Sequence, residues 1–152
     1  MNCPSALRSL FLVAVLLTSH AALADQNAAL IEARQEKLKE MGAATKVFRE
    51  ELKSDAPDLQ RMERAAARIA SYAPDLESWF PAGTGPDSGV DTDALAYIWK
   101  NTDKFTRVSK DLVTAADALV ITIGKGETGA IVEAVGTLGR ACKACHQSFR
   151  AD

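Results

Sequence analysis

The chain has 152 residues, of which 47% are hydrophobic and 25% are charged, and its formal net charge is −2 at pH 7. This length and composition fit one domain with an ordinary hydrophobic core. The absence of a basic excess argues against nucleic acid as a partner, because neutralising phosphates needs a cationic surface.

Residues 1–24 have the pattern of a secretory signal. Arg8 supplies a positive charge, a short apolar run follows over 10–17, and a small-x-small cleavage pattern ends at Ala24. The apolar run is far shorter than the ~20 residues that cross a bilayer as a helix. We therefore expect cleavage after Ala24, export to the periplasm, and a mature domain over 25–152 that is not held in a membrane.

The first half of the mature domain has the spacing of two amphipathic helices, with apolar residues recurring at steps of three and four. The first helix is expected over about 26–53. The second is expected to begin near 55–58 and to break or kink at Pro74, which cannot donate a backbone hydrogen bond. A loop rich in Gly, Pro, Ser and Asp follows over 81–93.

Two more helices are expected after this loop. The third carries an apolar stripe from Leu95 to Ile123 and should end at the glycine-containing segment 124–126. The fourth carries a similar stripe from Ile131 to Phe149. No segment alternates convincingly with the two-residue period of a strand. The pattern predicts an all-α fold, an antiparallel left-handed four-helix bundle.

The fourth helix contains the sequence Cys142-Lys143-Ala144-Cys145-His146. This is the Cys-x-x-Cys-His pattern of covalent c-type haem attachment. Residues three and four apart share one face of a helix, so both thiols and the imidazole can reach a single porphyrin. We expect Cys142 and Cys145 to form thioethers to one covalently bound haem c, and His146 to ligate its iron.

Other uses of these residues fit the sequence less well. Cleavage of the signal would remove Cys3 and His20, leaving too few cysteines and histidines in 25–152 for a closed zinc site. A thioredoxin-like Cys-x-x-Cys should open a helix beside a strand, and an exposed dithiol would tend to oxidise after export. Peroxide chemistry would want a second histidine or an arginine as a distal acid and base. We therefore expect a haem protein that is not an enzyme.

Several segments resemble one known family. The motif continues to Phe149 and Arg150, and residues 34–42 read Arg-Gln-Glu-Lys-Leu-Lys-Glu-Met-Gly. Trp79-Phe80, Gly83-Thr84-Gly85 and Trp99 add a weaker signal. In these residues the mature chain resembles cytochrome c′ and its class II c-type relatives. The resemblance implies one-electron transfer, redox partner proteins, binding of nitric oxide or carbon monoxide, and, as in many relatives, a possible homodimer through the first two helices.

The resemblance also implies roles for four side chains near the haem. Arg34 stands on an apolar stripe, so either a haem propionate pairs with its charge or its stem reaches the end of the bundle. Gln35 belongs to the same haem-binding segment. Leu38 is implied over the distal haem face. Arg150 is implied near the proximal face, where it would tune His146, although a basic residue in a last helical turn is favourable in any case.

Leu38 governs the predicted coordination of the iron. In low-spin relatives a methionine at this place supplies the sixth ligand, whereas leucine cannot ligate. The sequence therefore predicts five-coordinate iron that is open to nitric oxide and carbon monoxide. The alternative is a low-spin, six-coordinate His/Met electron carrier, with Met41 or Met62 as the ligand. Both methionines stand at core spacing, where methionine usually packs.

Overall fold

The computed structural model describes the backbone of residues 6–151 and the side chains of residues 25–151. Four long helices make up most of it: α1 (Ala6–Glu51), α2 (Leu59–Tyr72), α4 (Thr102–Lys125) and α5 (Thr128–Phe149). Three short helices lie between α2 and α4: η1 (Ala73–Trp79), η2 (Pro86–Ser88) and α3 (Tyr97–Lys100). Over this described part of the chain no strand forms, which confirms the predicted all-α class.

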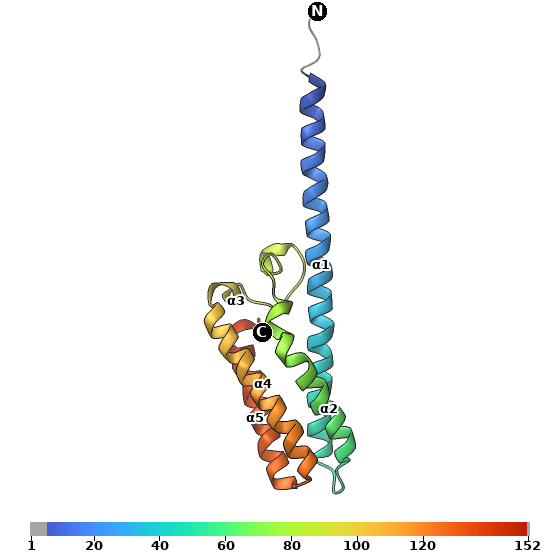
Figure 1. Ribbon diagram of the computed structural model, residues 1–152, viewed down its shortest axis with the longest axis vertical. Coiled ribbons are helices and arrows are strands. Elements are labelled where there is room, and N and C mark those ends of the chain that lie inside the picture. The colour runs from blue at the N-terminus through green and yellow to red at the C-terminus, as the bar shows by residue number, and fades with distance from the viewer. Residues whose placement is uncertain (1–5, 152) are drawn as a thin grey trace, which may run out of the picture.

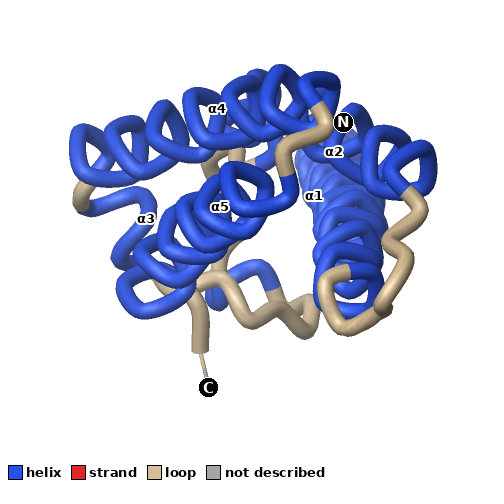
Figure 2. Tube along the Cα trace, turned by 90° about the horizontal axis from the view of Figure 1, so that it is seen from below, coloured by secondary structure: helices blue, strands red, loops and turns tan. Residues whose placement is uncertain are grey.

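The long helices form the predicted antiparallel four-helix bundle. Successive helices run in opposite directions, with the long connection from α2 to α4 crossing one end of the bundle (Figure 1). The close helix pairs are α1 with α2, α2 with α4, and α4 with α5. Figure 2 shows the bundle from below, that is, from the end opposite the long connection. Within the described residues α1 and α5 are not among the closely packed pairs, so one side of the bundle is left without direct helix packing.

Helix α1 starts earlier than predicted. The expected start near Gln26 is wrong, because the helix begins at Ala6 and its first part projects beyond the other helices (Figure 1). The reason is that residues 6–41 contain neither glycine nor proline and are rich in alanine and leucine, which favour helix. The signal predicted over 1–24 falls partly outside the described residues, and its cleavage stays a prediction. No described helix is both long and apolar enough to cross a membrane.

Helix α2 has the limits that its sequence predicted. A carboxylate oxygen of Asp58 accepts a hydrogen bond from the backbone N–H of Arg61 at 2.9 Å, which caps the first turn. The α-helical pattern ends at Tyr72, and the chain continues as the tighter helix η1 with Pro74 in its first turn. The predicted break at Pro74 is confirmed.

The predicted third helix is divided in two at Asn101. This residue has φ −139° and ψ 53°, which is outside the helical region, so α3 ends before it and α4 begins after it. Its side-chain amide donates to the carbonyl of Tyr97 at 3.3 Å, and its own carbonyl accepts from Phe105 at 3.0 Å. Asparagine readily makes such local hydrogen bonds instead of continuing a helix. The apolar stripe runs across the break and gave no sign of it.

The hydrophobic core consists of two clusters. The main cluster fills the space between the long helices and includes Phe48, Met62 and Leu119, each at most 1% exposed. The second cluster lies where the long connection meets the ends of α4 and α5, and comprises Ala94, Ile98, Phe105, Val108 and Phe149. Burying each large apolar side chain stabilises the fold by roughly 1.5–3 kcal/mol, so the two clusters hold the bundle and its connection together.

Two glycines at the end of α4 give a matched test of this fold. Gly126 ends the helix with φ +75°, a left-handed conformation that strains other residues, whereas Gly124 lies within the helix in open space. We expect Gly126→Ala to lower the free energy of unfolding by about 1 kcal/mol and Gly124→Ala to raise it by up to about 1 kcal/mol. Urea unfolding followed by circular dichroism measures both, and changes of the same sign would contradict the assigned helix end.

Candidate haem site

The predicted haem-binding motif occupies the last two turns of α5. Cys142 and Cys145 are free, half-buried thiols, and His146 is exposed. Cys142 packs against the main core cluster, whereas Cys145 packs against the second cluster. The motif therefore lies where the two clusters meet, and its three functional side chains share one side of the helix.

Burial sets the protonation of these groups. It raises the pKa of the Cys142 thiol, and together with the neighbouring Cys142 it raises the pKa of Cys145 to about 11. Both cysteines are therefore neutral thiols near pH 7, unlike the low-pKa cysteine of a disulfide-exchange enzyme. Although His146 is exposed overall, partial burial of its imidazole ring, followed by the charge of Arg150, lowers the pKa of His146. The imidazole is thus neutral near pH 7, the form that can bind a metal.

The side of α5 that carries Cys142 touches the edge of the main core cluster but is only partly covered by it. Val135 and Gly139 precede Cys142 by seven and three residues, so they lie along the same face. Val135 is half-buried, Val132 one turn before Gly136 is 52% exposed, and a Cβ at Gly139 would meet no atom within 4 Å. Two thiols, an imidazole and an apolar, open helix face are the set of groups that a covalently bound haem requires, so the residues present fit this cofactor.

Arg34 on α1 is buried beneath the long connection, with only 2% of its surface exposed. Its guanidinium donates to the carbonyl of Trp79 at 3.3 Å, to Oγ1 and the carbonyl of Thr84 at 3.0 and 3.1 Å, and to Oγ1 of Thr92 at 2.9 Å. The guanidinium carbon also lies 4.5 Å from the centre of the Phe80 ring. Burial lowers the pKa of Arg34.

All of these acceptors are neutral, and none of the ion pairs among the described side chains includes Arg34. The side chain does not extend into solvent at the end of the bundle, as one of the two expectations had it. It is a buried cation stabilised by dipoles and without a carboxylate partner. A haem propionate could supply that missing negative charge, and this pairing stays a prediction.

Gln35 on α1 and the Gly-Thr-Gly segment of the long connection make further contacts between these two parts of the fold. The side-chain amide of Gln35 donates to the carbonyl of Asp91 at 3.0 Å. Thr84 is fully buried, and it accepts two of the hydrogen bonds from Arg34. A Cβ at Gly85 would lie 2.9 Å from the Trp99 ring, so any larger residue here would have to displace that ring. Sequence reasoning singled out this segment only by resemblance; the structure shows that it holds α1 to the connection.

Arg150 lies just beyond the motif and contacts a residue that the sequence did not indicate. Its Nε and Nη2 atoms lie 3.3 and 3.2 Å from Oδ2 of Asp93. Its backbone N–H donates to the carbonyl of His146 at 3.2 Å, which keeps it at the end of the haem-binding helix. Asp93 sits in the connection 57 residues away, and a single aspartate in a loop that contains several gave no signal to find it by.

Comparison with known proteins decides the family. The model of the Cytochrome C′ family matches residues 29–150, which include the later part of α1, the Gly-Thr-Gly segment and the haem motif. The chain belongs to the cytochrome c′ family. It is 38% identical over 123 residues to a cytochrome c′ of Rhodopseudomonas palustris, covering 80% of this chain and 82% of that protein.

Two further cytochromes c′ support the same conclusion. The protein of Rhodospirillum rubrum is 35% identical over 141 residues, covering 92% of this chain and 94% of that one. The crystal structure of cytochrome c′ from Thermochromatium tepidum aligns with a TM-score of 0.76 at 29% identity, covering 83% of this chain and 97% of that one. The predicted resemblance is confirmed.

The candidate axial ligands of this cytochrome c′ family member lie in different surroundings. Met41 and Met62 are buried, 8% and 0% exposed, as members of the main core cluster. Leu38 is 37% exposed and does not belong to that cluster. The methionines thus pack the core, while the residue implied at the distal face is the accessible one.

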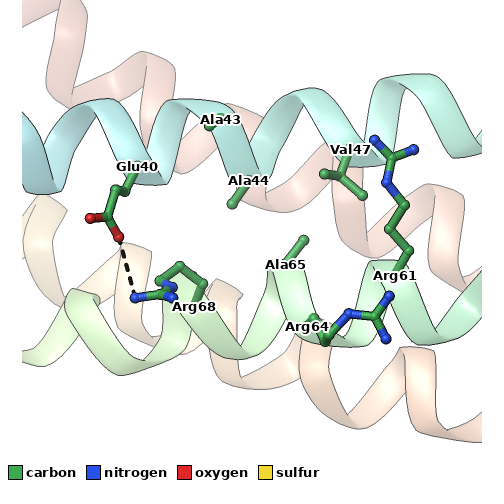
Figure 3. A pocket seen from close by; sticks show the side chains of 8 residues that line it. All are labelled: Glu40, Ala43, Ala44, Val47, Arg61, Arg64, Ala65 and Arg68. Atoms are coloured by element: carbon green, nitrogen blue, oxygen red, sulfur yellow. Dashed lines mark ion pairs between the residues drawn. The ribbon is translucent and has the colours of Figure 1, made fainter.

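A surface pocket of about 350 Å³ lies away from the motif, between α1 and α2. Figure 3 shows its floor of small side chains, its arginines, and the Glu40–Arg68 ion pair, which is 3.2 Å long. It is lined by Glu40, Ala43, Ala44, Val47, Arg61, Arg64, Ala65 and Arg68. No cysteine or histidine lines this pocket, so it offers no group for attaching or ligating a haem.

The role of Arg34 in holding the connection can be tested by unfolding. We expect Arg34→Met to lower the free energy of unfolding by about 2–3 kcal/mol, because buried acceptors on Thr84 and Thr92 lose their donor. Lys39→Met removes the same charge from an exposed position on α1 and should change it by less than about 0.5 kcal/mol. Equal effects of the two substitutions in denaturant titrations would show that the buried contacts contribute nothing.

Proposed function

We propose that this chain is an exported c-type haem protein that binds nitric oxide and carbon monoxide at a five-coordinate iron and transfers single electrons. The observation that carries the proposal is the contrast around the motif. Cys142, Cys145 and His146 stand together at an open apolar face, while both methionines that could complete the coordination are buried in the core. Membership of the cytochrome c′ family supports it.

Three side chains would hold one haem c. The thiols of Cys142 and Cys145 are neutral and lie on one helix face, as addition to two vinyl groups requires. His146 would present a neutral imidazole nitrogen to the iron. When bound, the haem supplies a redox-active iron with an open coordination position. Arg34 and Gln35, close to one another on α1, would lie toward its propionates, and Arg150 toward its proximal side.

The distal side would be closed by an aliphatic group. Leu38 offers no atom that can ligate iron and no hydrogen-bond donor for a bound gas. A methionine ligand would instead have to leave the core, at a loss of roughly 1.5–3 kcal/mol of buried apolar contact. An apolar distal wall favours nitric oxide and carbon monoxide over oxygen, which needs hydrogen-bond stabilisation.

The proposed location rests on the signal pattern over 1–24, and the proposed homodimer rests on the surface of α1 and α2. Cleavage after Ala24 would release the domain 25–152 into the periplasm, where redox partner proteins would exchange electrons with the haem. The homodimer implied by the resemblance would use α1 and α2. The small side chains between these helices, among them Ala43, Ala44 and Ala65, would allow close approach of a second copy (Figure 3).

The coordination of the iron can be read from visible spectra of the matured protein. We expect high-spin ferric bands and a ferrous form that binds carbon monoxide, because Leu38 leaves one face open. Leu38→Met should shift the spectrum toward low spin and weaken carbon monoxide binding at least tenfold. Leu30→Met, a similarly exposed position on the same helix, should do neither. A sharp low-spin ferrous spectrum of the wild type, unresponsive to carbon monoxide, would favour the His/Met electron carrier with Met41 as ligand.

Covalent attachment has its own test. Haem should stay with the chain on a denaturing gel for the wild type and for His146→Ala, since the thioethers do not need the axial ligand. It should be lost from the double variant Cys142→Ala, Cys145→Ala. Haem that separates from the denatured wild-type chain would contradict the proposed thioethers, whatever the spin state.

A further inference from the structure

The segment Asp91–Leu95 joins the two helices that flank the candidate haem site. On one side it is held by α1, since the carbonyl of Asp91 accepts from Gln35 at 3.0 Å and Oγ1 of Thr92 accepts from Arg34 at 2.9 Å. We call Asp91–Leu95 the strap. Within the described residues α1 and α5 are not closely packed, so the strap connects two helices that have little direct contact.

On its other side the strap pairs with the end of α5. Ala94 and Arg150 form an isolated antiparallel bridge. The N–H of Leu95 donates to the carbonyl of Phe149 at 2.9 Å, and the N–H of Ala151 donates to the carbonyl of Asp93 at 2.8 Å. These two hydrogen bonds hold the backbone of Arg150 extended, with φ −119° and ψ 139°. The direction in which the Arg150 side chain leaves the helix is thereby fixed.

Asp93 then fixes the end of that side chain. Its Oδ2 lies 3.3 Å from Nε and 3.2 Å from Nη2 of Arg150. The two side chains are 66% and 56% exposed, so this ion pair contributes no more than about 1 kcal/mol to stability. Its consequence is geometric: a flexible cationic side chain is restricted to one region beside the end of α5.

The position of that cation matters to the haem-binding helix. Arg150 follows His146 by one helical turn, and its backbone N–H donates to the His146 carbonyl at 3.2 Å, so the two residues are neighbours along the chain axis. The pKa of His146 is lowered first by partial burial and then by the charge of Arg150. The interaction of two charges falls with their separation and with exposure to water. Releasing the guanidinium from Asp93 would let it occupy other positions and would therefore change the electrostatic environment of His146 without removing the charge of Arg150.

We propose that Asp93 is a positioning residue that holds the guanidinium of Arg150 near His146 and thereby contributes to the reduction potential of the bound haem. This rests on the proposed function, in that a haem ligated by His146 must be present. Asp93 needs no contact with the haem for this effect, because it acts through Arg150. Its own position is fixed from both sides, by the contacts of the strap with α1 and with α5.

A double-mutant cycle on the matured haem protein tests the proposal. Reduction potentials are measured for the wild type, Asp93→Asn, Arg150→Gln and the double variant, with Asp91→Asn as the control that removes a carboxylate of the same strap. We expect the shift caused by Asp93→Asn to change by at least half when Arg150 is absent. The shift caused by Asp91→Asn should be the same in both backgrounds. If the Asp93→Asn shift is also the same in both, the proposal is overturned.

Two further measurements separate a positioning role from other effects. Asp93→Glu keeps the carboxylate and should retain most of the wild-type coupling, whereas a pure packing role would not be rescued. In crystal structures, the Arg150 guanidinium should leave its wild-type position in Asp93→Asn but not in Asp91→Asn; an unmoved guanidinium overturns the proposal. The double-mutant cycle on reduction potentials can be measured whether the iron is five- or six-coordinate. Failure of the proposed gas binding would show in the carbon monoxide spectrum, so it is distinguishable from failure of this inference.

Discussion

The buried guanidinium of Arg34 is the constraint on which the arrangement around the site depends. A cation removed from water destabilises a fold by several kcal/mol unless its donors are satisfied. Here the acceptors come from the end of η1 and from Thr84 and Thr92 in the long connection. The connection can lie in only a narrow range of positions if all of them are to reach one side chain. The charge of Arg34 thus determines how the end of the bundle is covered.

The position of the long connection also determines how the bundle is closed. Three sides are closed by direct packing of neighbouring long helices, and the fourth, between α1 and α5, is spanned by the strap at its end. On this side of α5, Val132 and His146 are exposed, and Cys142 at the edge of the core is only half-buried. A planar apolar cofactor attached there would take the place of helix packing. The same strap carries Asp93, so the cover of the bundle and the ion pair with Arg150 at the end of α5 share one segment.

Two predictions from the sequence, the start of α1 and an unbroken third helix, are wrong for physical reasons that can be named. The signal pattern over 1–24 predicts a start of α1 near Gln26, yet no glycine or proline between Ala6 and Met41 interrupts the helix. The break at Asn101 was missed because the apolar stripe continues through it, and a stripe records which face is buried, not whether the backbone is continuous. The break at Pro74 was found because proline removes a donor whatever the surroundings.

The sequence by itself determined the class of the fold and which residues form the candidate haem site. Cys142, Cys145 and His146 are close in the chain, so helical geometry alone places them together, and the period of the apolar residues requires four packed helices. The tertiary structure decided which partners the charged residues have. Arg34 meets acceptors 45 to 58 residues away, and Arg150 meets Asp93 across 57. Such contacts depend on the path of the whole connection, and no local spacing encodes that path.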